Sequence, residues 1–161
     1  MDIRPVPFDH PDALKLNDEV QAEYDVRYGD GGDATHLSPS DFAPPHGLYL
    51  LAYDDKGVPV ASGGWRGQDA NDEGNLDGDA ELKRMFVIEQ MRGRGLARRI
   101  LALLEEDARA AGRVRMVLET GTKQPEAVAL YASSGYAPCE KFGYYRHHEE
   151  SLCYAKTLAR P

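Results

Sequence analysis

Residues 80–97 read Ala-Glu-Leu-Lys-Arg-Met-Phe-Val-Ile-Glu-Gln-Met-Arg-Gly-Arg-Gly-Leu-Ala, and this stretch decides the fold. Residues 80–88 predict a strand, and residues 95–111 predict a helix with apolar side chains at helical spacing. The two glycines between them let backbone N–H groups approach a ligand closely, and the start of the helix exposes N–H groups without helical partners. The turn is therefore predicted to bind an anion.

Alternation along the predicted strand places Glu81, Lys83, Met85 and Val87 on one face. The predicted helix presents one apolar face, made of Leu96, Ile100, Leu103, Leu104 and Ala108.

Four arginines, Arg92, Arg94, Arg98 and Arg99, surround the two glycines. Cations at a helix N-terminus are unfavourable by a few tenths of a kcal/mol each, so a bound anion explains them better than a solvated basic turn does. A Rossmann fingerprint needs Gly or Ala where this chain has Arg98, and no Gly-Lys-Ser/Thr phosphate loop occurs. Both nucleotide motifs are therefore excluded.

The rest of the chain predicts short strands and helices in a mixed order. The expected elements are a strand at 3–6, a helix at 11–29 with Leu16, Val20, Tyr24 and Tyr28 at i+4 spacing, a loop with one short helical turn at 30–45, a hairpin of 47–53 and 58–65, a polar loop at 68–79, a strand at 114–120, a helix at 125–135, and a closing antiparallel pair at 136–141 and 152–158. This order indicates a mixed α/β fold with βαβ units only in its later half.

Composition predicts one soluble globular domain, because the chain has 161 residues, 42% of them hydrophobic and 29% charged. The longest apolar run, Gly47–Tyr53, is too short to span a membrane. The first ten residues lack the pattern of a secretory leader, so a cytoplasmic location is expected.

Cys139 and Cys153 are interpreted as reduced packing residues. They lack the spacing of a zinc site, and neither has a neighbouring base in the sequence that would activate it as a nucleophile.

The net charge of −8 argues against nucleic acid as a partner. The charge is divided unevenly: residues 1–81 hold 18 acidic and 5 basic residues, whereas residues 82–161 hold 9 and 14. One interpretation is that the two halves serve differently charged ligands, and the other is chance clustering on solvated faces.

The segment Gln90-Met91-Arg92-Gly93-Arg94-Gly95, after a strand ending Phe86-Val87, resembles the acetyl-CoA-binding motif of the GNAT N-acetyltransferases. The resemblance continues to about residue 158 through Leu118-Glu119-Thr120-Gly121, Gln124, Ala129-Leu130-Tyr131 and Gly135-Tyr136, in the family's order of strand, helix and closing strand. It implies the acyl-CoA N-acyltransferase fold over residues 1–161: an α/β (α+β) domain with a mixed, mostly antiparallel sheet, a central parallel strand pair, and helices on both faces.

The resemblance also implies acetyl-CoA as co-substrate and no metal. The pantetheine arm is expected where the strands at 80–88 and 114–120 splay apart, paired with backbone groups of Met85, Phe86 and Val87. The residues implied around the pyrophosphate are Gln90, Arg92, Gly93, Arg94, Gly95, Leu96 and Ala97. Gln124 stands where many members carry Asn, and Tyr131 matches the family's usual general acid, next to the cofactor.

Amine acetylation requires a neutral amine, stabilisation of an oxyanion and protonation of the departing thiolate. A phenol such as Tyr131 can supply that proton. Two carboxylates are candidates for the base: Glu81 on the strand before the motif, and Glu119, which matches the glutamate of the ribosomal-protein N-acetyltransferase branch. The sequence does not choose between them.

The resulting prediction is an enzyme that moves an acetyl group from acetyl-CoA to a small-molecule amine or a peptide N-terminus in a ternary complex. The alternative is a non-catalytic module that senses acyl-CoA. The acidic half supplies elements that flank the acceptor side in this family, so an acidic rim that attracts cationic amines is expected. Residues 142–145, Phe-Gly-Tyr-Tyr, fit the acceptor pocket, an aromatic core, or a contact between the copies of a homodimer.

Two sequence patterns resemble metal-binding sites, but we do not interpret either as one. Residues 69–74 imitate the start of a calcium loop, but Ala80 stands where the bidentate Glu is needed, so a solvated hairpin loop is preferred. His147 and His148 are adjacent and would point to opposite faces of a strand, so the pair is not expected to bind one metal ion together.

Overall fold

The computed structural model describes residues 1–29 and 32–158 and has the predicted order of elements. The strands are β1 (Asp2–Pro5), β2 (Gly47–Tyr53), β3 (Pro59–Gln68), β4 (Asp79–Val87), β5 (Arg115–Gly121), β6 (Ala137–Pro138) and β7 (Ser151–Thr157). The helices are α1 (Pro11–Tyr28), α2 (Leu96–Ala110) and α3 (Pro125–Ser133), with short 3₁₀ turns at Pro39–Phe42 and Glu89–Met91.

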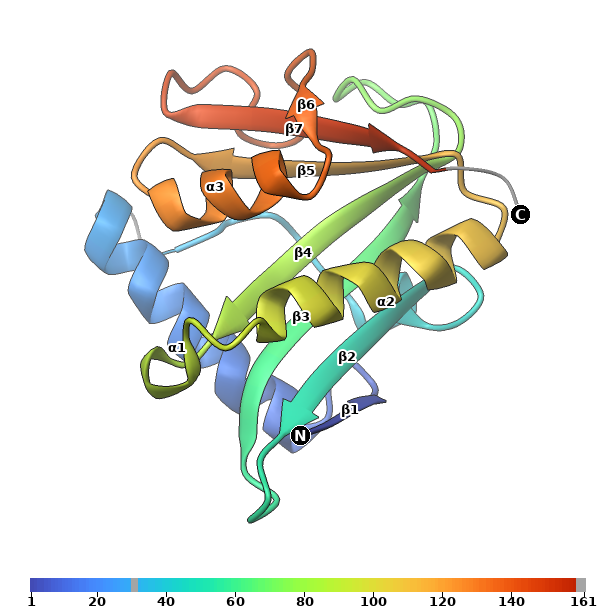
Figure 1. Cartoon of the computed structure of the whole chain (residues 1–161). Coiled ribbons are helices and arrows are strands. Elements are labelled where there is room, and N and C mark those ends of the chain that lie inside the picture. Colours follow the sequence, from blue (N-terminus) through green and yellow to red (C-terminus); the bar gives the residue numbers. More distant parts are fainter. Residues whose placement is uncertain (30–31, 159–161) are drawn as a thin grey trace.

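The strands form one sheet in the order β1-β2-β3-β4-β5-β7-β6. Every neighbouring pair is antiparallel except β4 and β5, which are parallel. Figure 1 shows α2 and α3 on one face of the sheet and α1 on the other. The mostly antiparallel sheet, the central parallel pair and the helices on both faces are therefore confirmed.

The parallel pairing of β4 and β5 is short. It covers Asp79 with Arg115, Ala80 with Met116 and Glu81 with Val117, after which the two strands diverge (Figure 1). Beyond Glu81, β4 keeps β3 as its strand neighbour while β5 continues beside β7. The sheet therefore opens at its centre, where the sequence predicts that the two strands splay apart.

A β-bulge in β4 overturns the predicted alternation. Ser62 opposes Phe86 and Gly64 opposes Lys83, so Arg84 and Met85 together face one residue of β3. Arg84 takes the left-handed backbone conformation, with φ of 58°.

The bulge reverses which side chains share a face. Glu81 and Lys83 lie on the α1 side, where they contact Arg66 and Asp33, whereas Met85 and Val87 pack into the cluster on the α2 side. The prediction that Glu81, Lys83, Met85 and Val87 share a face was wrong, because the inserted residue shifts the period-2 pattern by one.

The main core lies between α2 and the sheet. Ile100, Leu101, Leu104 and Ala108 are buried there, and a Cβ on Gly63 of β3 would collide with Ile100. The predicted apolar face of α2 was wrong at one position, since Leu103 is 42% exposed.

The features interpreted as structural are packed or bonded locally. Both cysteines are unpaired, and Cys153 is buried with Val117 and Phe142. The loop between β3 and β4 is closed by its own side chains: Asn71 Oδ1 accepts from the N–H groups of Glu73 and Asn75.

Among residues 1–29 and 32–158, no helix combines the length and apolarity needed to cross a membrane.

Two adjacent leucines of α2 test this packing. We expect Leu104→Ala to lower the free energy of unfolding by about 2–5 kcal/mol, because Leu104 is fully buried and truncation leaves a cavity. Leu103→Ala is the matched control and should cost under about 1 kcal/mol. Urea denaturation measures both, and equal losses would contradict the burial described.

Candidate active site

A cavity of about 180 Å³ lies where β4 and β5 diverge. It is lined by the end of α1, the loop after it, β4, β5, α3 and residues 145–151. This volume accommodates a small molecule and is far larger than a single water requires.

Tyr131 lines this cavity from α3. Its ring packs edge-on against Tyr136, with 5.6 Å between ring centroids. Burial raises the pKa of the Tyr131 phenol above its usual range, and the nearby Tyr24 phenol adds to the effect. The hydroxyl therefore stays protonated at neutral pH and is available as a proton donor.

Glu119 lines the same cavity from β5. Burial raises its pKa to about 7; Lys83 acts in the opposite direction, and the Glu81 carboxylate raises it further. The Ser151 hydroxyl donates to Oε2 at 3.2 Å. A carboxyl that titrates near 7 can accept a proton at physiological pH and also release it.

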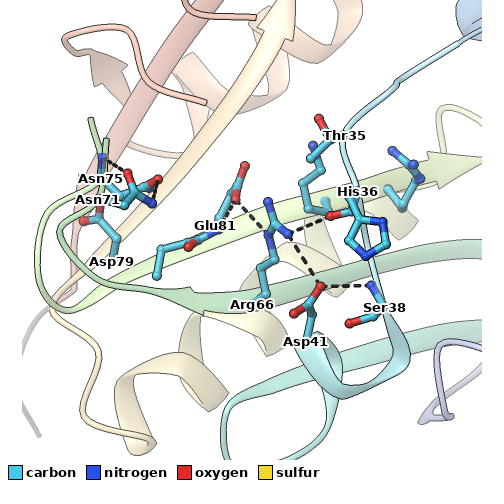
Figure 2. Close-up of polar contacts among 12 residues, drawn as sticks. Thr35, His36, Ser38, Asp41, Arg66, Asn71, Asn75, Asp79 and Glu81 are labelled. Atoms are coloured by element: carbon cyan, nitrogen blue, oxygen red, sulfur yellow. Dashed lines mark hydrogen bonds and ion pairs between the residues drawn. The ribbon is translucent and has the colours of Figure 1, made fainter. Parts of the chain in front are cut away.

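Glu81 is held away from the cavity lining by its own partners. Arg66 Nε and Gln68 Nε2 both donate to Glu81 Oε1 at 3.0 Å. Figure 2 shows Glu81 and Arg66 pointing toward each other, with Arg66 extending to Asp41 and to the carbonyl of His36. The two carboxylates predicted as candidate bases therefore occupy different places: Glu119 faces the described cavity and Glu81 joins β4 to residues 36–41.

Three charged groups of the cavity lining form one ion cluster. Lys83 Nζ lies 3.0 Å and Arg84 Nη1 lies 2.6 Å from the same oxygen, Oδ2 of Asp33. Burial disfavours the Asp33 carboxylate, but Lys83 and Arg84 together hold its pKa well below its usual range. The bulge at Arg84 brings both cations to the α1 side.

The predicted anion-binding turn connects β4 to α2. Gly93 and Gly95 have φ of 78° and 79°, values that favour glycine, and a Cβ on either would meet nothing within 4 Å. Gly95 is the N-cap of α2, no side chain caps this helix, and its first turn has no acidic residue. The N–H groups of the first turn are thus free to receive an anion.

Two arginines tie this turn to other elements. Arg92 donates from Nε to the Val87 carbonyl at 2.9 Å and reaches Glu23 of α1. Arg98 Nη1 and Nη2 bond the hydroxyls of Ser134 and Ser133 at the end of α3. The start of α2 therefore lies beside the end of α3, the part of that helix that carries Tyr131.

The other implied cofactor residues are divided between the end of β4, the start of α3 and the turn before α2. Met85, Phe86 and Val87 form the end of β4 after the divergence. Gln124 is the N-cap of α3, lines the cavity and donates to the Tyr28 hydroxyl at 3.3 Å. Gln90 is exposed beside the turn, while Leu96 is buried beneath it.

Several lining residues were not predicted from the sequence. Tyr24 and Tyr28 were assigned to the apolar face of the first helix by their i+4 spacing, yet both line the cavity. Residues 142–145 divide between two of the expected roles: Phe142 is buried in the core, and Tyr145 lines the cavity, where its hydroxyl accepts from the N–H of Ala34. Tyr144 is 54% exposed.

Comparison with known proteins agrees with this geometry. The family model "Acetyltransferase (GNAT) family" matches residues 13–136, more than half of the chain. The chain belongs to the GNAT acetyltransferase family. Among solved structures, it is similar to a Klebsiella pneumoniae protein assigned as an acyl-CoA N-acyltransferase, with 25% identity and a TM-score of 0.81 over 98% of this chain and 97% of that one.

Two further similarities concern other GNAT acetyltransferases. An IAA acetyltransferase of Azospirillum brasilense is 43% identical over 81 residues, which are 50% of this chain and 53% of that protein. The match thus spans about half of the relative's length. An aminoglycoside 6'-N-acetyltransferase complexed with coenzyme A has a TM-score of 0.71 at 16% identity, covering 100% of this chain and 99% of that one, which shows a shared fold.

Within the described part of this GNAT chain, no group of three or more His, Cys, Asp or Glu side chains could hold a metal ion. The titratable groups of the cavity lining are two carboxyls outside the ion cluster, the phenols, one imidazole and the cluster itself: Glu119, Glu150, Tyr24, Tyr28, Tyr131, Tyr145, His148, Asp33, Lys83 and Arg84.

The raised pKa of Glu119 predicts a pH-dependent effect on stability. From about pH 4.5 to 7 the unfolded chain ionises Glu119 while the folded protein keeps it protonated, so this group makes the fold less stable as pH rises through that window. We expect Glu119→Gln to be more stable than the parent by about 2 kcal/mol at pH 8, and close to the parent at pH 4.5. Thermal and urea unfolding at both pH values measure this. A difference that does not change with pH would contradict it.

Proposed function

We propose that this GNAT protein transfers the acetyl group of acetyl-CoA to a primary amine by direct attack in a ternary complex. The observation that carries the proposal is that Glu119, with a pKa near 7, and the protonated phenol of Tyr131 line one cavity at the point where β4 and β5 diverge. A base and an acid in one site are what the reaction needs.

The residues present fit coenzyme A as a substrate. The uncapped start of α2 suits its pyrophosphate, with Gly93 and Gly95 allowing close backbone approach. Arg94 and Arg99 are exposed beside this turn and would add charge toward the phosphates. The end of β4, residues 85–87, would pair through its backbone with the pantetheine amides, since β5 has turned away.

Glu119 is assigned as the base. An amine arrives protonated at neutral pH, and the Glu119 carboxylate takes one proton so that the nitrogen can attack the thioester carbonyl. Glu81 is instead assigned a positioning role, because its ion pair with Arg66 joins β4 to residues 36–41.

Tyr131 is assigned as the acid. When the carbon–sulfur bond breaks, the Tyr131 hydroxyl donates its proton to the coenzyme A thiolate and regains one from the new amide nitrogen. Burial raises its pKa above that of the thiol, so the transfer must accompany bond breaking rather than precede it. The products are the N-acetylated amine and free coenzyme A.

The alternative, a module that binds acyl-CoA without turnover, needs neither Glu119 nor Tyr131 in the cavity. Their placement supports the enzyme. We further propose that residues 1–161 act as one acetyltransferase domain.

Thiol release from acetyl-CoA, measured with a panel of amines, tests the reaction and the base together. We expect kcat/KM to rise with pH through about 7, because the Glu119 carboxylate is the active form. Glu119→Gln should lower kcat/KM by about 10²-fold or more and remove this inflection. Glu149→Gln, on an exposed neighbouring segment, is the control. Absence of release with every amine would contradict the proposed reaction.

The acid is tested by Tyr131→Phe, which keeps the ring packed against Tyr136 and removes the hydroxyl. We expect kcat to fall by about 10²-fold while the affinity for coenzyme A, measured by calorimetry, changes little. Full turnover in this variant would move the acid role to another group.

A further inference from the structure

We propose that the acceptor is a small amine that also carries a carboxylate, such as a free amino acid, and that Lys83 and Arg84 bind this carboxylate. The inference rests on the proposed function and names its substrate class. It comes from the ion cluster of Asp33, Lys83 and Arg84 in the cavity lining, which the transfer chemistry does not use.

The cluster has more positive than negative charge. Lys83 and Arg84 both bond Oδ2 of Asp33, while Oδ1 of Asp33 accepts from the Thr35 N–H at 2.9 Å. One carboxylate therefore serves two buried cations, and another carboxyl of this lining, Glu119, titrates with a pKa of about 7 and so neutralises the second cation only in part. A buried charge without a counterion is costly, so a site of this kind favours an anionic ligand.

Arg84 has unused donor capacity. Its side chain is 6% exposed, Nη1 is bonded to Asp33, and Nε is buried with no hydrogen-bond partner. Arginine binds carboxylates through two parallel N–H groups, and a buried N–H that lacks an acceptor destabilises the empty site. A ligand carboxylate at this wall would share the Arg84 guanidinium with Asp33.

The amine and the carboxylate of one small molecule fit the two walls. Lys83 and Arg84 lie on β4 and Glu119 lies on β5, and all three line the cavity. Lys83 is close enough to Glu119 to lower its pKa. An amino acid with its carboxylate on Arg84 would thus have its ammonium group in the cavity that Glu119 also lines.

This lining differs from the acidic rim that composition predicted. Among described residues of the acidic half, the carboxylate that lines the cavity is Asp33, and it is neutralised by Lys83 and Arg84. Glu150, from the other half, pairs with Lys123. The first half thus adds no net negative charge to the described lining, and an acidic rim around the opening stays a prediction.

The test uses the twenty standard amino acids and their carboxamides, which keep the amine and lose the carboxylate charge. We expect at least one amino acid to exceed its carboxamide about tenfold or more in kcat/KM for thiol release. Arg84→Gln should lower kcat/KM for that amino acid by about 30-fold or more, and change the value for the carboxamide by less than about threefold. Arg84→Lys should recover part of the loss, and Arg4→Gln, an exposed arginine on β1, is the matched control.

Calorimetric binding of the same compounds to the protein saturated with coenzyme A gives a readout that does not depend on turnover. Binding of an amino acid that requires Arg84, without thiol release, would support the carboxylate site and overturn the proposed reaction. Amino acids and carboxamides that bind and react equally, or an equal loss for both in Arg84→Gln, would overturn the carboxylate site while leaving the reaction in place. If Arg84→Gln fails to fold, Lys83→Met is the second variant, and its readout is calorimetric binding, in which the amino acid should lose affinity and the carboxamide should not; turnover is not the readout because Lys83 also acts on the pKa of Glu119.

Discussion

The early separation of β4 from β5 is the constraint on which the other features of the site depend. The strands pair over three positions and then part, so the centre of the sheet presents backbone and side chains to a cavity rather than to another strand. Backbone groups in a sheet need partners, and an opening of this kind persists only where other groups can satisfy them. In this fold the end of β4 and the start of α2 are the places where a substrate can do so.

The bulge at Arg84 decides which side chains face that opening. It places Met85 and Val87 in the core under α2 and brings Lys83 and Arg84 together on Asp33. Without the bulge, alternation would direct Arg84 into the apolar side of the sheet. The same inserted residue therefore keeps the core apolar and supplies the cavity with its cations.

The sequence was sufficient for the order of elements, the sheet class and the position of the turn before α2, because these depend on local signals. Glycines before an apolar-periodic helix, with no acidic residue in its first turn, favour an anion site over a turn that serves only to connect two elements. The bulge carried no such signal: Arg84 is a non-glycine residue with positive φ, and the strand around it reads as regular.

Long-range pairing is what the sequence could not supply. Glu81 and Glu119 looked equivalent in sequence, and only their contacts separate them: Arg66 and Gln68 hold the first, whereas burial raises the pKa of the second. The uneven charge of the two halves could not describe the lining either, because Asp33 meets its cations across about fifty positions of the chain. Composition cannot show which charges neutralise one another.

Hydrogen exchange of backbone amides, with and without acetyl-CoA, tests the central claim that the opening of the sheet is the substrate site. We predict that protection increases at residues 85–87 and 93–98, at the end of β4 and the start of α2, while the β2–β3 hairpin and β1 are unchanged. Protection confined to other segments, or no change at either stretch under saturating acetyl-CoA, would contradict this claim.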